Sequence, residues 1–309
     1  MRNISKAAIM VILFLCSIFF VSCSGNNDKE PLLIYKGHSQ RAEMEYEIRL
    51  FKDIGKEQNE WRIQSVGLDK SQEYLFKLDG SNRVLVYNFN TQKYIAEMTK
   101  PKETGHDNDF CFIGDTMYIV GSKITSYLGE TQKLYKWTME EDKIERLEIK
   151  GIEPAQGISI RCLMGVCSYS ENELILVTQD YLPDIPPKET FNVKHESTDK
   201  LCVYLYNLES MQAEKIFEKQ WDAVFVQGAT LIGNQLFIAC NIQTERASKY
   251  KGVEIQIIDL KEREEVDKII IPGIFEAEGL FSYRKDDEFY LLFGLARPGS
   301  IAQIVTMKV

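Results

Sequence analysis

Histidine is scarce in this sequence, and the motifs of the common enzyme classes are missing from it. The chain has three histidines, His38, His106 and His195, and no two of them have the spacing of a zinc-binding pair. It also lacks a nucleophile elbow, a Walker loop, a dinucleotide-binding fingerprint and a haem-attachment Cys-x-x-Cys-His. Metal and catalytic chemistry are therefore weakly supported, and we expect no cofactor.

Cysteines are too few and too irregularly placed for a disulfide framework. Two of the seven lie in the N-terminal region, and the others are Cys111, Cys162, Cys167, Cys202 and Cys240. An odd number leaves at least one thiol unpaired. Most of these five have apolar neighbours, where cysteine behaves as a small buried hydrophobic residue, so we expect buried free thiols.

Basic residues are outnumbered by acidic ones, 37 to 46, and the net charge is -9. A chain of this charge repels phosphate backbones, so nucleic acid is not an expected partner. Removal of residues 1–22 would also remove Arg2 and Lys6 and would lower the net charge by two, to -11.

The only long apolar run of the sequence lies at its N-terminus. Arg2 and Lys6 precede residues 7–20, which are almost all apolar, and the tetrapeptide Phe20-Val21-Ser22-Cys23 resembles a bacterial lipobox. The run is shorter than the roughly 20 residues of a membrane-spanning helix, and it ends in small residues, as a cleavage site does. A lipoprotein signal is therefore favoured over a membrane anchor helix.

This interpretation divides the chain into three parts. Residues 1–22 are the expected signal peptide, and residues 23–30 form a flexible tether that carries lipid on Cys23. Residues 31–309 remain for a single domain. We expect it in the bacterial cell envelope, attached to a membrane by its lipid and facing the periplasm or the cell surface.

The domain repeats itself about every fifty residues. Apolar runs rich in Val, Ile, Leu and Tyr recur at residues 84–89, 133–137, 201–206, 253–258 and 302–305. Their starting positions differ by 49, 68, 52 and 49 residues. Each is preceded by two strand-like runs and followed by a charged turn and another run, such as residues 144–149 or 265–271. Short strands at such a period predict an all-β fold, a β-propeller.

The number of blades follows from the two ends of the domain. The fifth unit stops after its third strand, whereas residues 31–36 and 43–51 supply strand material before the first unit. An N-terminal strand can complete the last blade and remove exposed edges. We therefore expect five blades closed by an N-terminal strand. A sixth blade built from residues 31–58 is the alternative, and two packed sheets are a third possibility.

A polar signature recurs where the first strand of each unit begins. It reads Gln64-Ser65-Val66, Asn108-Asp109-Phe110, Gln156-Gly157-Ile158, Gln227-Gly228-Ala229 and Glu278-Gly279-Leu280. Because innermost strands line the axis of a propeller, these side chains are expected to form a polar ring near one mouth. Two interpretations stay open: glycines and amides that let crowded strands approach one another, or side chains that contact a ligand.

The repeat pattern resembles that of bacterial propellers of the YncE, TolB-like and glutamine-cyclotransferase-like kinds. The similarity covers residues 60–309 and includes Gln-Gly or Glu-Gly before an apolar strand and the Asp259-Leu260 end of another strand. Those groups include noncatalytic binding proteins and some enzymes. The resemblance implies the propeller fold, but no residue matches an enzyme's active site.

Long connections are expected to surround the same mouth. Residues 180–200 contain Tyr181 and His195, residues 241–251 contain Arg246, and residues 294–300 contain Arg297. Long loops in compact domains are often functional. A tolerated surface insertion is the alternative for residues 180–200.

Two functions remain open. The leading one is a noncatalytic protein that binds a peptide, a glycan or another envelope protein. The competing one is a cyclotransferase-, hydrolase- or lyase-like enzyme for a small polar substrate. The candidate ligand-binding residues are Asn108, Asp109, Gln156, Gln227, Glu278, Tyr181, His195, Arg246 and Arg297. Zinc or calcium held by His106, Asp109 and Glu278 is a further alternative.

Overall fold

A computed structural model describes most of the chain after residue 30. The described residues are 31–41, 45–51, 54, 63–79, 82–122, 133–157, 159–181, 198–220, 225–243, 250–273, 276–296 and 303–309. They form strands and no helix. Nothing in this part of the chain is therefore a helix that could cross a membrane. The expected signal peptide, Cys23 and the expected tether lie outside the described residues.

Four of the five sheets contain four antiparallel strands each. The first contains β3 (Ser65–Leu68), β4 (Tyr74–Asp79), β5 (Arg83–Asn88) and β6 (Lys93–Thr99). The second contains β7 (His106–Ile113), β8 (Thr116–Ser122), β9 (Lys133–Thr138) and β10 (Lys143–Arg146). The third contains β11 (Ile160–Ser170), β12 (Glu173–Tyr181), β13 (Lys200–Asn207) and β14 (Gln212–Gln220). The fourth contains β15 (Phe225–Ile232), β16 (Gln235–Gln243), β17 (Tyr250–Asp259) and β18 (Glu264–Pro272).

The fifth sheet is made from both ends of the described chain. Its order is β1 (Leu32–His38), β2 (Glu45–Leu50), β21 (Gln303–Lys308), β20 (Glu288–Ala296) and β19 (Glu276–Lys285). β2 pairs with β21, with Glu47 opposite Lys308. The expected closure by an N-terminal strand is thus confirmed. The alternative of a sixth blade from residues 31–58 is wrong, because β1 and β2 extend the fifth sheet.

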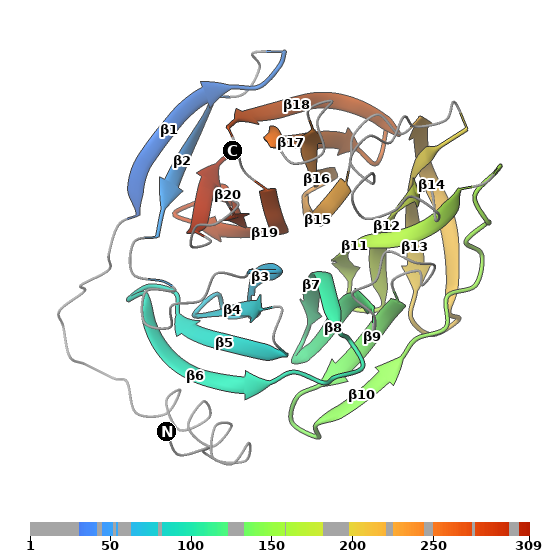
Figure 1. Cartoon of the computed structure of the whole chain (residues 1–309), viewed down its shortest axis with the longest axis horizontal. Helices are drawn as coiled ribbons and strands as arrows, with labels where there is room; N and C mark the ends of the chain where they lie inside the picture. Colours follow the sequence, from blue (N-terminus) through green and yellow to red (C-terminus); the bar gives the residue numbers. More distant parts are fainter. Residues whose placement is uncertain are drawn as a thin grey trace.

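The five sheets are the blades of a propeller, arranged around a common axis (Figure 1). The innermost strands β3, β7, β11, β15 and β19 contact one another in ring order, and β19 returns to β3. The prediction of a five-bladed all-β propeller is confirmed.

Apolar side chains between adjacent blades make the core. Val177 and Val203 of the third blade, for example, pack with Leu236 and Ile238 of the fourth. Four further buried clusters occupy the other junctions between blades. Burying one such aliphatic side chain contributes roughly 1.5–3 kcal/mol. Within β5, Leu85 and Tyr87 pack in one cluster and Val84 and Val86 in another, so consecutive apolar residues supply both faces of this blade.

Two smaller expectations concern the cysteine thiols and the last strand of the second blade. All five cysteines of the propeller are unpaired, and four of them are buried. The expected strand at residues 144–149 is shorter than predicted, because β10 ends at Arg146.

Candidate functional site

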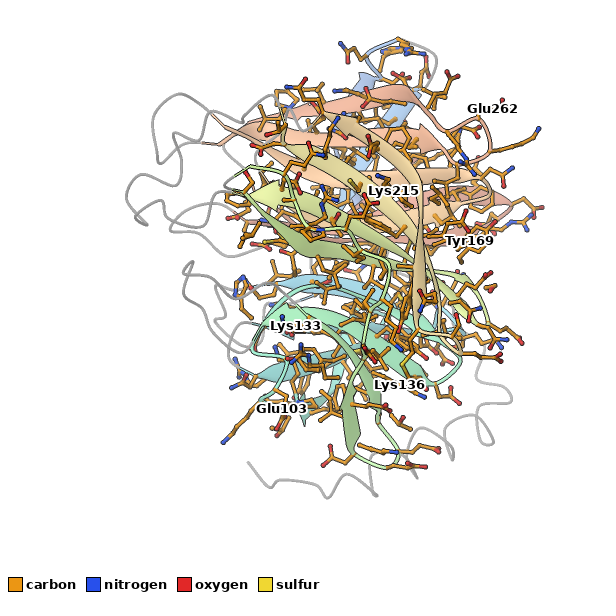
Figure 2. All side chains as sticks on the ribbon, turned by 90° about the vertical axis from the view of Figure 1, so that its right-hand side faces the viewer. Glu103, Lys133, Lys136, Tyr169, Lys215 and Glu262 are labelled. Carbon is orange, nitrogen blue, oxygen red and sulfur yellow. The ribbon has the colours of Figure 1, made fainter. Side chains whose placement is uncertain are left out.

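All five innermost strands start on one face of the ring, which we call the entry face. Figure 2 shows Glu103, just before β7, and Lys133, at the start of β9, toward this face. Tyr169, near the end of β11, and Glu262, between β17 and β18, lie on the opposite face in the same view. The starts of the inner strands therefore gather their side chains around one end of the axis.

Backbone atoms crowd the axis just below these strand starts. A Cβ atom on Gly228 would lie 2.4 Å from the backbone nitrogen of Leu280. A Cβ atom on Gly279, whose φ is +68°, would lie 2.5 Å from Oγ of Ser65. These glycines are needed because adjacent strands approach more closely than any side chain permits. The inner strands therefore leave no room for side chains at these two positions.

Asp109 joins three blades from the second inner strand. Its Oδ2 accepts hydrogen bonds from the backbone amides of Val166 in β11 and Ala229 in β15, both at 2.9 Å. Burial raises the pKa of the Asp109 carboxyl well above its usual range, although backbone amides oppose the shift. The side chain is fully buried. This geometry favours the structural interpretation of Asp109.

Asn108 has a similar position. Its Nδ2 donates to the carbonyl oxygen of Met164 and, at 3.1 Å, to that of Val226. Gln179, at the end of β12, accepts a hydrogen bond from the Val226 amide at 2.7 Å. Both side chains are buried. They hold the second, third and fourth blades together around the axis.

A second polar cluster lies between the fourth and fifth blades. Gln227 Nε2 donates to Oε1 of Glu276 at 2.9 Å, and Asn241 Nδ2 lies 3.5 Å from the same oxygen. Asn241 Oδ1 in turn accepts from the backbone amide of Ala277 at 2.9 Å. Two amide side chains therefore orient the Glu276 carboxylate at the start of β19.

Glu278 is the exception among these polar groups. It is 8% exposed, and its carboxyl makes no hydrogen bond or ion pair with another described residue. Burial, and secondly the charge of Glu276, raise the pKa of Glu278 well above its usual range. A neutral carboxyl can donate one hydrogen bond as well as accept others. We call Gln227, Asn241, Glu276 and Glu278 together the axial mouth.

Ion pairs stabilise strands near the entry face. Arg161 binds Asp180 through two hydrogen bonds, Nε to Oδ1 at 2.8 Å and Nη2 to Oδ2 at 3.0 Å. Burial lowers the pKa of Arg161, but the hydrogen bond to Asp180 and the electrostatic effects of neighbouring groups together outweigh it and hold that pKa above its usual value. Lys100 and Asp107 form a second pair that is fully buried. Each of these charges therefore has a partner of opposite sign within the protein.

One predicted position of the polar ring is wrong. Gln156 is exposed and precedes the inner strand of its blade, which begins at Ile160. Met164-Gly165-Val166 occupies the place that the signature assigned to Gln156-Gly157-Ile158, since Asn108 and Asp109 bind Met164 and Val166. The short β10 displaces the chain before the third blade, so the local signature misled the assignment.

The remaining site predictions concern a metal site and the residues of the long connections. No group of three His, Cys, Asp or Glu side chains that could hold a metal ion occurs among the described residues, so His106, Asp109 and Glu278 do not form one. His106 itself is exposed at the start of β7. Tyr181 ends β12, but its side chain is outside the described part of the structure, as are His195, Arg246 and Arg297. Their role as ligand-binding residues stays a prediction.

Three polar residues near the axis were not expected from the sequence: Gln179, Asn241 and Glu276. Gln179 and Asn241 each follow an apolar run near the end of a second strand, where a polar residue interrupts the buried pattern. Glu276 stands two residues before Glu278, so its carboxylate faces the same end of β19. A search for polar residues at both ends of paired strands would have found all three.

Comparisons with known proteins assign no family to this chain. No protein-family model and no curated protein matches the chain. Among solved structures, it is similar to the Myxococcus xanthus glutaminyl cyclase, with 8% identity, a TM-score of 0.47, and coverage of 85% of this chain and 97% of the other.

Two further structures resemble it at similarly low identity. Kuenenia stuttgartiensis hydrazine synthase shares 10% identity with a TM-score of 0.40, over 83% of this chain and 65% of that one. The structure of U3-55K shares 9% identity with a TM-score of 0.42, over 80% of each chain. The fold is that of a five-bladed β-propeller.

Proposed function

We propose that this chain is a lipid-anchored propeller of the cell envelope that binds a small polar ligand at the axial mouth without transforming it. The observation that carries the proposal is Glu278, a residue that is 8% exposed and whose carboxyl has no partner among the described residues. An unpaired buried polar group costs free energy. A ligand that hydrogen-bonds to Glu278 would remove that cost.

The surrounding groups suit recognition of a polar molecule. Gln227 and Asn241 fix the Glu276 carboxylate, so the mouth offers a positioned acceptor beside Glu278. A few convergent polar groups in a concavity are typical of small-molecule sites. A peptide terminus or a sugar hydroxyl fits this chemistry, and the acidic mouth disfavours anions.

A thermal-shift screen tests the proposal. The probes are amino acids, short peptides and mono- to tetrasaccharides, applied to the propeller and to two variants. A ligand at 100 times its Kd stabilises by about 2.7 kcal/mol, which raises Tm by roughly 5 °C or more in a domain of this size. We expect Glu278→Gln to lose the shift and Glu262→Gln, on the opposite face, to keep it. A shift that survives in Glu278→Gln places the site elsewhere.

An enzyme is the second candidate, and the raised pKa of Glu278 favours it. A buried carboxyl with a raised pKa beside a second carboxylate is a common arrangement for general acid catalysis. Any ligand from the screen would be incubated with the protein and its products analysed by mass spectrometry. Turnover that Glu278→Gln abolishes while binding persists would establish the enzyme. A ligand recovered unchanged supports the binding protein.

A further inference from the structure

The chain leaves the second blade early, after β10. β10 has four residues, whereas the outer strands β14 and β18 of the next two blades have nine each. Beyond it, Lys150 bonds to the third blade: its amide donates to the Met211 carbonyl at 2.9 Å, and its carbonyl accepts from the Ala213 amide at 2.7 Å. The connecting segment, residues 147–152, therefore links the outer edges of two blades, and we call it the bridge.

A hollow of about 480 Å³ lies beneath this bridge. Leu134 of β9 and Leu163 of β11 are buried in its wall, and the bridge adds three partly buried aliphatic side chains, Leu147, Ile149 and Ile152. The volume is within the range of small-molecule sites. Because the shortened strand opens the junction between the blades, the hollow is a product of the fold.

The charged groups around the hollow are mainly basic, in a chain whose net charge is -9. They are Lys133, Arg146 and Arg161, against a single acid, Glu148, which lies 3.7 Å from the Lys150 amine. Arg161 is held by Asp180, as described above. Arg146 is exposed and makes no ion pair or hydrogen bond with another described residue.

A second hollow offers a comparison. It has about 490 Å³ and lies between the fifth and first blades, with aromatic side chains in its floor. Its charges are matched: Arg49 pairs with Glu47 at 2.7 Å, and Lys308 pairs with Glu288 at 2.5 Å. That hollow therefore has no preference for one sign of charge, whereas the hollow beneath the bridge does.

We propose that the hollow beneath the bridge binds a small aliphatic carboxylate, separately from the axial mouth. The alkyl chain would lie against the leucine and isoleucine side chains, which releases water from apolar surface on both partners. The carboxylate would face Arg146, whose guanidinium is suited to paired hydrogen bonds with a carboxylate. The apolar wall and the basic rim together select an anionic amphiphile.

Calorimetry with three eight-carbon probes tests this assignment. Octanoate, octan-1-ol and octyltrimethylammonium share the alkyl chain and differ in charge. We expect octanoate to bind most tightly, and Arg146→Glu to weaken it about tenfold. Lys70→Glu, which reverses a charge at an exposed turn of the first blade, should leave the affinity for octanoate unchanged. Any of four results overturns the proposal: equal binding of the alcohol, tighter binding of the cation, no binding of any probe, or an unchanged affinity for octanoate in Arg146→Glu.

A second variant checks the location. Ile152→Trp places a large side chain at a partly exposed position in the hollow, and we expect octanoate binding to disappear while Tm stays within a few degrees. If Ile152→Trp unfolds the protein, Ile152→Phe gives the same test with a smaller ring. Full affinity in either folded variant shows that octanoate lies elsewhere and contradicts the assignment.

Discussion

Polar residues around the axis fall into two groups with different tasks. Asn108, Asp109 and Gln179 bind backbone groups of neighbouring blades, so they fix how the blades meet. Glu278 makes no such bond within the described residues, and burial raises its pKa. Residues of the first group are therefore expected to govern stability, and Glu278 to govern recognition.

The raised pKa of Glu278 makes a prediction about pH. Burial makes this carboxyl hold its proton more tightly in the folded protein than in the unfolded one. The free energy of unfolding therefore falls as pH rises from the ordinary pKa of the carboxyl, about 4.5, toward the raised value. Glu278→Gln removes this loss, so its stability relative to the wild type should increase between pH 5 and pH 8. Urea unfolding at both pH values measures it, with Glu262→Gln as control. Parallel pH profiles for wild type and Glu278→Gln would contradict the prediction.

At the scale of elements, the closing strand β2 carries a measurable share of stability. Ile48 is buried between blades, so Ile48→Ala should reduce the free energy of unfolding by about 2–5 kcal/mol. Leu32 on the neighbouring strand β1 is 45% exposed, and Leu32→Ala should cost less than about 1 kcal/mol. Chemical denaturation of both variants provides the measurement. Equal losses would mean that β2 does not contribute to the core as its burial indicates.

Strand periodicity predicted most of the strands of the propeller. It located the polar residues near the axis much less well. The alternation of Tyr46, Ile48 and Leu50 with charged residues predicted a strand, and the missing fourth strand of the fifth unit placed it in the last blade. The third inner strand could not be located in the same way, because Gln156-Gly157 copies the signature eight residues too early. Glu276 and Asn241 meet only where the fourth and fifth blades pack together, which no local pattern contains.

At the scale of the whole molecule, attachment to a membrane rests on Cys23 in our proposal. Cys23→Ala removes the thiol that would accept the lipid, so the precursor should remain unprocessed or be found in the wrong cell fraction. Mass spectrometry of the N-terminal peptide should show acylated Cys23 in the wild type and in a Ser24→Ala control. An unmodified mature N-terminus at another residue would contradict the prediction.

Pairing of Glu47 with Lys308 joins segments that leave the ribosome at very different times. β2 is synthesised before every strand of the first four blades, and β21 after all of them. β2 must therefore wait, without its partner, until β21 is available, and contacts so distant in sequence form slowly. In the exported protein that we propose, the ring can close only after both segments have crossed the membrane. A chain interrupted before β21 keeps an open edge, which proteases and chaperones can recognise.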